Sequence, residues 1–141
     1  MKKSRSLPRI LIVEDSVTFQ EIYLEILGAD YSVTIVDDKH TALAQLRTHL
    51  FDVALIDMRL REGDGDNTDG LDIAAFVRAH CPATAMILKS GFVTVADASS
   101  YRERIERLNF FAVLDKTEEG QIQVLRETVA RAVAARLDKL G

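Results

Sequence analysis

The sequence predicts an α/β protein, with a single doubly wound, five-stranded parallel sheet covered by five helices. Short apolar runs alternate along the whole chain with longer segments whose apolar residues recur at helical spacing. The chain has 141 residues, 48% of them hydrophobic and 28% charged, which suits one folded domain with one core. Strands that alternate with helices in this way are joined by right-handed crossovers into a parallel sheet.

Five apolar runs predict the strands. Residues 9–13, 52–56 and 85–88 are almost continuously apolar, as in strands that are buried on both faces of a parallel sheet, so we expect them in its centre. Residues 31–36 alternate polar and apolar side chains, and residues 110–114 form the last apolar run. We expect these two strands at the edges.

Five amphipathic segments predict the helices, at residues 17–28, 39–50, 70–80, 94–108 and 118–140. The stripes of the first two include Tyr23 and Leu50, which we expect in the core. The fourth segment has few apolar residues among many charged ones, so we expect an exposed, lightly packed helix. The fifth is longer than the sheet requires. Its apolar stripe reaches Leu140, which suits a dimer contact, a linker to a further domain, or an ordinary packing helix.

The distribution of charge argues against nucleic-acid binding. The chain carries 18 basic and 22 acidic residues, a formal net charge of −4. Four basic residues lie in the first nine positions, which leaves 14 basic and 22 acidic residues, a net charge of −8, in residues 10–141. Nucleic-acid-binding domains usually present a basic face on the folded body. We expect residues 1–8 to be a disordered basic tail and residues 9–141 to be the folded domain.

Cysteine content and hydropathy restrict the compartment. Cys81 is the single cysteine, which excludes an internal disulfide and a thiolate zinc cluster and favours the reducing cytoplasm. His80 precedes it and Pro82 follows it, and this arrangement indicates a helix end rather than a nucleophile with its base. No apolar run approaches the length of a membrane span or a secretory signal, so we expect no membrane association.

Polar side chains follow four of the five predicted strands. Because the carboxyl ends of parallel strands meet at one sheet edge, where such folds bind ligands, we expect these residues to converge. Carboxylates that converge repel one another unless a cation lies between them, and oxygen ligands suit Mg²⁺. An Asp beside such an ion can attack phosphorus, with a lysine and a hydroxyl to balance the charge. The residues concerned are Glu14-Asp15, Asp57, Lys89-Ser90-Gly91 and Asp115-Lys116-Thr117.

Five short motifs occur in a recognisable order: Ile-Leu-Ile-Val-Glu14-Asp15-Ser, Ala-Leu-Ile-Asp57-Met, Asp69-Gly70-Leu71, Ile-Leu-Lys-Ser90-Gly and Val-Leu-Asp-Lys116. One alone is a weak signal, but five in register are specific. Over about residues 9–138 the chain resembles the receiver domain of two-component response regulators, which are related to the single-domain chemotaxis regulator. The resemblance implies a flavodoxin-like sheet of strand order 2-1-3-4-5. It also implies a signalling switch that catalyses only its own phosphotransfer and autodephosphorylation.

The resemblance also implies a metal site and a phosphoacceptor. Asp57 would accept a phosphoryl group from the phosphohistidine of a sensor histidine kinase or of a phosphotransfer protein. Asp57 and Asp15 would bind Mg²⁺ directly, Glu14 would bind it through water, and the backbone carbonyl of Arg59 would complete the protein ligands.

Two further residues would respond to the phosphoryl group. Lys116 would pair with its oxygens, and Ser90 would move toward it. In the family, this movement repacks the face formed by the fourth helix, the fifth strand and the fifth helix. A downstream effector protein or domain, or a second copy of the chain in a homodimer, would bind there.

Three features depart from the family pattern. The stretch between Asp57 and Asp69 is longer than usual and contains an acidic loop at residues 61–68. Its spacing suggests calcium, but position twelve, counted from the first Asp of the loop, is Ala75 rather than Glu, which does not match an EF-hand. Thr117 replaces the usual proline after the lysine, and Val113 replaces the usual switch aromatic.

Three other functions fit parts of the pattern. A receiver-like protein-interaction module that works without phosphorylation fits the missing aromatic and proline, but not the complete acid and lysine set. A phosphatase of the haloacid dehalogenase type would need a second Asp where Arg59 stands. A flavin carrier shares the architecture, but its phosphate needs a better cradle than the acidic, glycine-free loop at residues 14–18.

Overall fold

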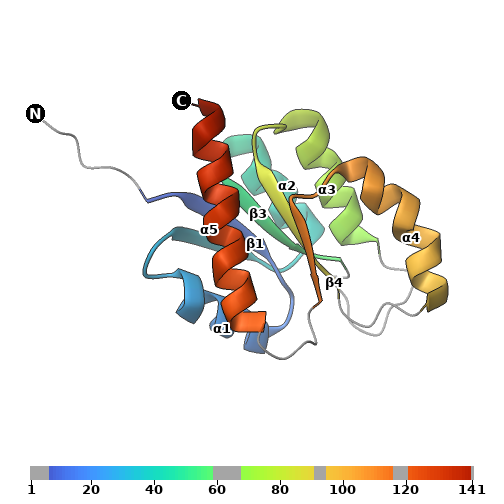
Figure 1. The fold of residues 1–141 in the computed structure, drawn as a ribbon, viewed down its shortest axis with the longest axis horizontal. Coiled ribbons are helices and arrows are strands. Elements are labelled where there is room, and N and C mark those ends of the chain that lie inside the picture. The colour runs from blue at the N-terminus through green and yellow to red at the C-terminus, as the bar shows by residue number, and fades with distance from the viewer. Residues whose placement is uncertain (1–6, 59–67, 91–94, 116–120, 141) are drawn as a thin grey trace, which may run out of the picture.

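The predicted fold class is confirmed. The structure, a computed structural model, describes residues 7–58, 68–90, 95–115 and 121–140. Its strands form one five-stranded sheet in the order β2-β1-β3-β4-β5, and every neighbouring pair is parallel. Figure 1 shows the strands alternating with helices along the chain. Strand order reverses at β1 and β3, so the edge of the sheet beyond their carboxyl ends is the expected ligand site.

The boundaries of the strands agree with those of the predicted runs to within two residues. The strands are β1 (Arg9–Val13), β2 (Ser32–Val36), β3 (Val53–Asp57), β4 (Ala85–Ser90) and β5 (Ala112–Asp115). The central strands are buried along almost their whole length, whereas β2 and β5 lie at the edges, as predicted.

The helices also follow the predicted segments, and they are α1 (Val17–Leu27), α2 (Lys39–Thr48), α3 (Asp69–His80), α4 (Val95–Leu108) and α5 (Gln121–Leu140). The predicted tail and the predicted first residues of the last helix, 118–120, lie largely or wholly outside the described residues. Cys81 caps the end of α3, in agreement with its interpretation as a helix terminus.

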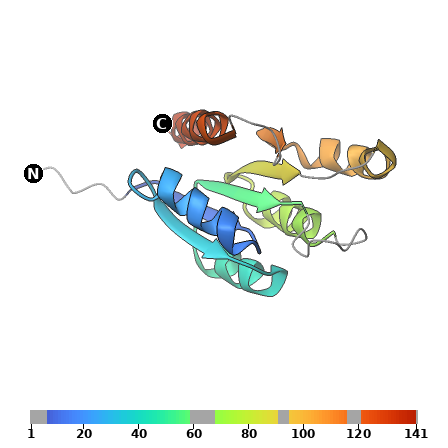
Figure 2. The same cartoon turned by 90° about the horizontal axis from the view of Figure 1, so that it is seen from below.

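Two hydrophobic cores lie on the two faces of the sheet. Alternate residues of each strand point to opposite faces, so Ile10 and Ile12 face α1 and α5, whereas Leu11 and Val13 face α2, α3 and α4. Figure 2 shows the sheet between these two sets of helices. The same alternation assigns strand-end residues to a face, so it decides which of them can meet.

One core prediction is wrong. Leu50 is 76% exposed, because α2 ends at Thr48 and the extended backbone of His49 turns the chain away from the helical stripe. Phe51, which the helical pattern did not include, is buried instead, at 2% exposure. The helical spacing therefore predicts burial correctly only as far as the last hydrogen-bonded turn of α2.

Helix α4 is lightly packed, as predicted. It contacts α3, and Leu108 is its one buried residue among those whose side chains are described. Asn109, which follows it, has a φ of 54°, a left-handed conformation that asparagine tolerates better than most residues. This turn directs the chain into the edge strand β5.

Candidate functional site

Strand β1 and helix α1 position Glu14 and Asp15 in the short turn between them. The backbone N–H of Glu14 donates to the carbonyl of Val36 at 2.9 Å, which continues the pairing with β2 by one residue. Ser16 then caps α1, and its hydroxyl accepts from the N–H of Phe19 at 3.4 Å. The two acids therefore lie where a strand ends and a helix begins.

The carboxylate of Glu14 is held by the start of that helix. Its Oε2 accepts from the backbone N–H of Ser16 at 3.1 Å, and its backbone carbonyl accepts from the side-chain amide of Gln20 at 2.6 Å. Glu14 is 1% exposed. The N–H groups at a helix N-terminus attract negative charge, so this turn suits a carboxylate.

Asp57 ends the central strand β3 and is 4% exposed. The register pairs it with Lys89 of β4, and the N–H of Met58 donates to the carbonyl of Lys89 at 2.9 Å. The next helix also approaches closely: a Cβ added to Gly70 would lie 2.1 Å from the carbonyl oxygen of Asp57. The backbone around Asp57 is thus fixed on both sides.

The three predicted acids come together as expected from their strand ends. One carboxylate oxygen from each of Glu14, Asp15 and Asp57 lies within 4.8 Å of the others. Oδ1 of Asp15 is buried and has no hydrogen-bond partner among the described residues. Three carboxylates at this separation repel strongly, and a hard divalent cation such as Mg²⁺ would both offset that repulsion and bind the oxygen of Asp15.

Several predicted residues are placed only in part or not at all. Ser90 is the last residue of β4 and directly follows Lys89, the register partner of Asp57, so its backbone lies at the same ends of the strands as the acid cluster. Lys116, Arg59 and Thr117 lie outside the described residues, as does most of the loop at 61–68. Val113 is on β5 and is 49% exposed.

Two buried polar residues near the cluster have surroundings that the sequence did not predict. Lys89 is 3% exposed, and its Nζ lies 5.9 Å from the centre of the Tyr23 ring. Tyr23 was expected only as a core residue, and it is buried. Burial, together with the charges of Glu14 and Asp57, raises the pKa of the Tyr23 hydroxyl far above its ordinary value. The available signal was a lysine directly after the apolar run at residues 85–88.

The lone cysteine has no catalytic environment. Burial raises the pKa of the Cys81 thiol above its ordinary value, whereas a nucleophilic cysteine needs a lowered one.

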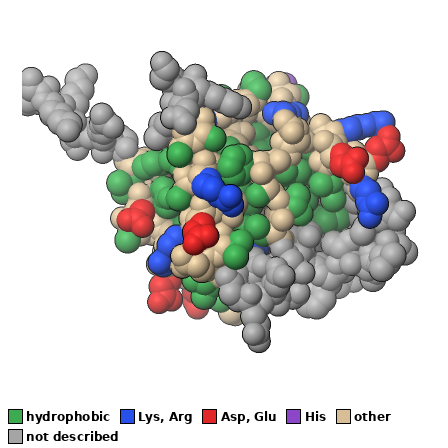
Figure 3. Space-filling model, viewed as in Figure 1, with side chains coloured by type: hydrophobic (Ala, Val, Ile, Leu, Met, Phe, Trp, Pro, Cys, Tyr) green, Lys and Arg blue, Asp and Glu red, His purple; other side chains and the backbone are tan. Residues whose placement is uncertain are grey.

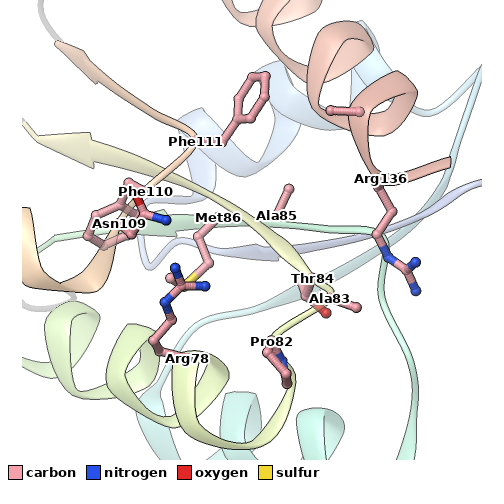
Figure 4. Close-up of a pocket in the computed structure, with 11 residues that line it drawn as sticks. Arg78, Pro82, Ala83, Thr84, Ala85, Met86, Asn109, Phe110, Phe111 and Arg136 are labelled. Atoms are coloured by element: carbon pink, nitrogen blue, oxygen red, sulfur yellow. The ribbon is translucent and has the colours of Figure 1, made fainter. Parts of the chain in front are cut away.

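A hollow of about 250 Å³ lies at the amino-terminal ends of β4 and β5, opposite the strand ends that bear the acid cluster. Figure 4 shows Arg78 and Arg136 on either side of the first residues of β4. Nε of Arg136 lies 3.8 Å from Oδ1 of Asp52, so its charge is already partly balanced. The hollow is smaller than most ligand pockets, which measure roughly 300–1,000 Å³. It contains none of the predicted site residues.

Among the described residues, no helix combines the length and the apolar character that crossing a lipid bilayer requires.

Comparison with known proteins agrees with this geometry. The sequence matches the response regulator receiver domain family over residues 10–129. It is 30% identical over 126 residues to the transcriptional regulatory protein ZraR of Salmonella typhimurium, and equally to that of Salmonella typhi. The match covers 89% of this chain but 26% of each relative. The chain therefore spans about a quarter of the length of these curated relatives.

Solved structures support the fold. A response regulator receiver domain protein from Methanospirillum hungatei has a TM-score of 0.79 at 22% identity, covering 96% of this chain and all of that one. A response regulator from Thermotoga maritima has a TM-score of 0.70 at 17% identity, covering 91% and 98% of the two chains. Together with the five-stranded order and the acid cluster at the carboxyl ends of its strands, the family match establishes that the chain belongs to the response regulator receiver domain family.

Proposed function

We propose that this chain is a phosphorylation-activated signalling switch in which Asp57 accepts a phosphoryl group, with Mg²⁺ bound beside it. The observation that carries the proposal is the acid cluster: Asp57 lies with Glu14 and Asp15 at the edge where strand order reverses. The donor of the phosphoryl group is the phosphohistidine of a sensor histidine kinase or of a phosphotransfer protein. A receiver domain serves signalling, so the chemistry is confined to its own phosphorylation and dephosphorylation.

The chain's own groups suit this transfer. A carboxylate oxygen of Asp57 would attack phosphorus, forming an O–P bond as the N–P bond of the phosphohistidine breaks and its electron pair returns to the imidazole. Asp57, Asp15 and Glu14, with the backbone carbonyl of Arg59, would hold Mg²⁺, which draws negative charge from the phosphoryl oxygens. Asp15 fits this role because its Oδ1 is buried and accepts no hydrogen bond among the described residues.

Two further residues respond to the transferred phosphoryl group in this proposal. Lys116 pairs with the phosphoryl oxygens, and Ser90, at the end of β4, moves toward them. A new doubly charged group at this edge changes the balance of charge around the strand ends, which is the physical basis of a phosphorylation switch.

The output surface is proposed to lie on α4, β5 and α5. Phe111 and Val113 are 41% and 49% exposed, and Ile122 and Val124 of α5 are exposed too. Figure 3 shows hydrophobic side chains among charged ones on the face that bears these elements. Exposed apolar side chains of this kind suit a downstream effector protein or domain, or a second copy of the chain in a homodimer.

The direct test is intact-protein mass after incubation with Mg²⁺ and acetyl phosphate. We expect the wild type to gain one phosphoryl group, and we expect Asp57→Asn, or omission of Mg²⁺, to abolish the gain. Asp69→Asn is the matched control, because it removes a carboxylate at the start of α3 and leaves the acid cluster intact.

The opposite outcome would favour the interaction module. If folded wild type forms no adduct with Mg²⁺ and acetyl phosphate, and no beryllofluoride complex either, phosphorylation is not its mode of action. Binding of partners without phosphorylation would then be the better description.

A further inference from the structure

Lys89 is a buried cation on the same face of the sheet as the phosphoacceptor. Its register partner on β3 is Asp57, and residues paired in this way project to the same side of a sheet whose strands lie about 4.8 Å apart. On β5 its partner is Leu114, which belongs to the core shared with α1 and α5. Lys89 thus extends into that core and is 3% exposed.

Tyr23 of α1 connects this cation with the acids. The Nζ of Lys89 lies 5.9 Å from the ring centre, within reach of a cation–π contact. The Tyr23 ring is itself buried, and its hydroxyl has no hydrogen-bond partner among the described residues. The charges of Glu14 and Asp57 both contribute to the raised pKa of that hydroxyl, so the ring that contacts the ammonium also lies near two acids of the cluster.

A lysine in this position needs a compensating charge. Removing an ammonium from water is costly unless anions are near, and the three carboxylates of the cluster carry a combined charge of about −3 when all are ionised. Water screens such charges poorly when both partners are buried. The ammonium and a metal ion bound by the cluster would accordingly repel each other through the protein interior.

We infer that Lys89 is a resident counter-cation of the acid cluster, which offsets part of its negative charge before metal binds and thereby weakens binding of Mg²⁺. The inference rests on the proposed function, since it concerns the metal site of the same switch. Its consequence is that the site loads with Mg²⁺ only at a higher concentration than the three acids alone would require. Lys89 acts here through the field of its charge and is not itself a metal ligand.

The test is the dissociation constant of Mg²⁺, measured by calorimetry on the full chain without a phosphodonor. Lys89→Met keeps the length and the apolar stem but removes the charge. We expect it to bind Mg²⁺ about tenfold more tightly, equivalent to about 1.4 kcal/mol. Lys89→Arg, which keeps the charge, should bind Mg²⁺ much as the wild type does.

Arg9→Met is the matched control. Arg9 also places a cation over an aromatic ring, 5.2 Å from the centre of Phe51, but at the amino-terminal end of β1, away from the acids. It should leave the Mg²⁺ affinity unchanged. A merely structural role for Lys89 predicts the same unchanged affinity for Lys89→Met.

The outcomes separate this inference from the proposed function. Wild type that binds Mg²⁺ as tightly as Lys89→Met overturns the inference and leaves the proposed function standing. Binding by Lys89→Met but not by wild type supports the inference in its strongest form. If neither protein binds Mg²⁺ while both remain folded by circular dichroism, the inference and the metal step of the proposed function both fail.

Discussion

At the scale of single residues, Gly70 is a position where the fold tolerates no side chain. An added Cβ would lie 2.1 Å from the carbonyl oxygen of Asp57 and 2.6 Å from that of Met58. Both atoms belong to the backbone that leaves β3, which cannot move as freely as a flexible side chain. The start of α3 can therefore approach the end of β3 this closely only because residue 70 has no side chain.

Gly70→Ala should destabilise the protein, because α3 must move away from the strand that bears Asp57. We expect a loss of about 2–4 kcal/mol in the free energy of unfolding, measured by urea denaturation. The phosphorylation of Asp57 by acetyl phosphate should also slow. A stability within about 0.5 kcal/mol of wild type, as for an ordinary surface substitution, would show that the backbone accommodates the methyl group.

At the scale of elements, charged side chains tie the lightly packed α4 to the rest of the molecule. Oδ1 of Asp72 on α3 lies 2.6 Å from a guanidinium nitrogen of Arg104 on α4, and its Oδ2 lies 3.5 Å from Nζ of Lys39 on α2. Burial by itself raises the pKa of Asp72, but Arg104 and Lys39 outweigh burial and hold that pKa below its ordinary value. One carboxylate thus links three helices on one face.

The contribution of Asp72 should depend on pH. The folded protein binds the proton of this carboxyl less firmly than the unfolded chain does, so ionised Asp72 stabilises the fold above its unfolded pKa of about 3.9. That stabilisation is lost as the pH falls through the lower folded value. Asp72→Asn should cost at most about 1 kcal/mol at neutral pH, because all three side chains are more than a third exposed. The difference from wild type should vanish in acid.

Hydrogen exchange can locate this effect. The amides of residues 102–108 should exchange faster in Asp72→Asn than in wild type, since α4 loses its tie to α3. Glu103→Gln is the matched control, because Glu103 pairs with Arg107 within α4 and, in the part of the chain that the structure describes, forms no ion pair with another element. Equal protection of α4 in wild type and Asp72→Asn would mean that apolar packing around Leu108 holds the helix by itself.

At the scale of the whole molecule, we expect the acid cluster to couple the binding of a metal ion to stability. Three like charges within 4.8 Å destabilise the metal-free fold, and an ion that binds only the folded state raises its melting temperature. Asp15→Asn removes one of these charges. It should melt at a higher temperature than wild type without metal, and addition of Mg²⁺ should stabilise it much less.

Thermal unfolding with and without Mg²⁺ checks this expectation. Asp30→Asn serves as the control, because Asp30 is exposed in the turn before β2, at the other end of that strand from the cluster. It should respond to Mg²⁺ as wild type does. An Asp15→Asn variant that melts below wild type in the absence of metal would argue that Asp15 stabilises the fold rather than the ion.

The sequence by itself determined most of the architecture. Apolar runs predicted the strands, and apolar residues at helical spacing predicted the helices. A strand that is buried on both faces is apolar throughout, whereas a helix that is buried along one stripe is apolar only at every third or fourth residue. The meeting of the three acids also followed from their positions in the chain, because parallel strands end at a common edge. The spacing of apolar residues does not show where a helix ends. Leu50 was therefore expected in the core, although the chain leaves the helix at His49.

Only the tertiary structure decided the surroundings of the acids. Lys89 and Tyr23 lie far apart in the sequence, and each has an ordinary local explanation, as a polar strand end and as a core residue of a helix. Their contact near the acid cluster depends on the register of β4 against β3 and on the packing of α1 over the sheet. The close approach of Gly70 to Asp57 has the same origin. Local patterns determine which faces are buried, whereas contacts between distant segments determine which charges are buried together.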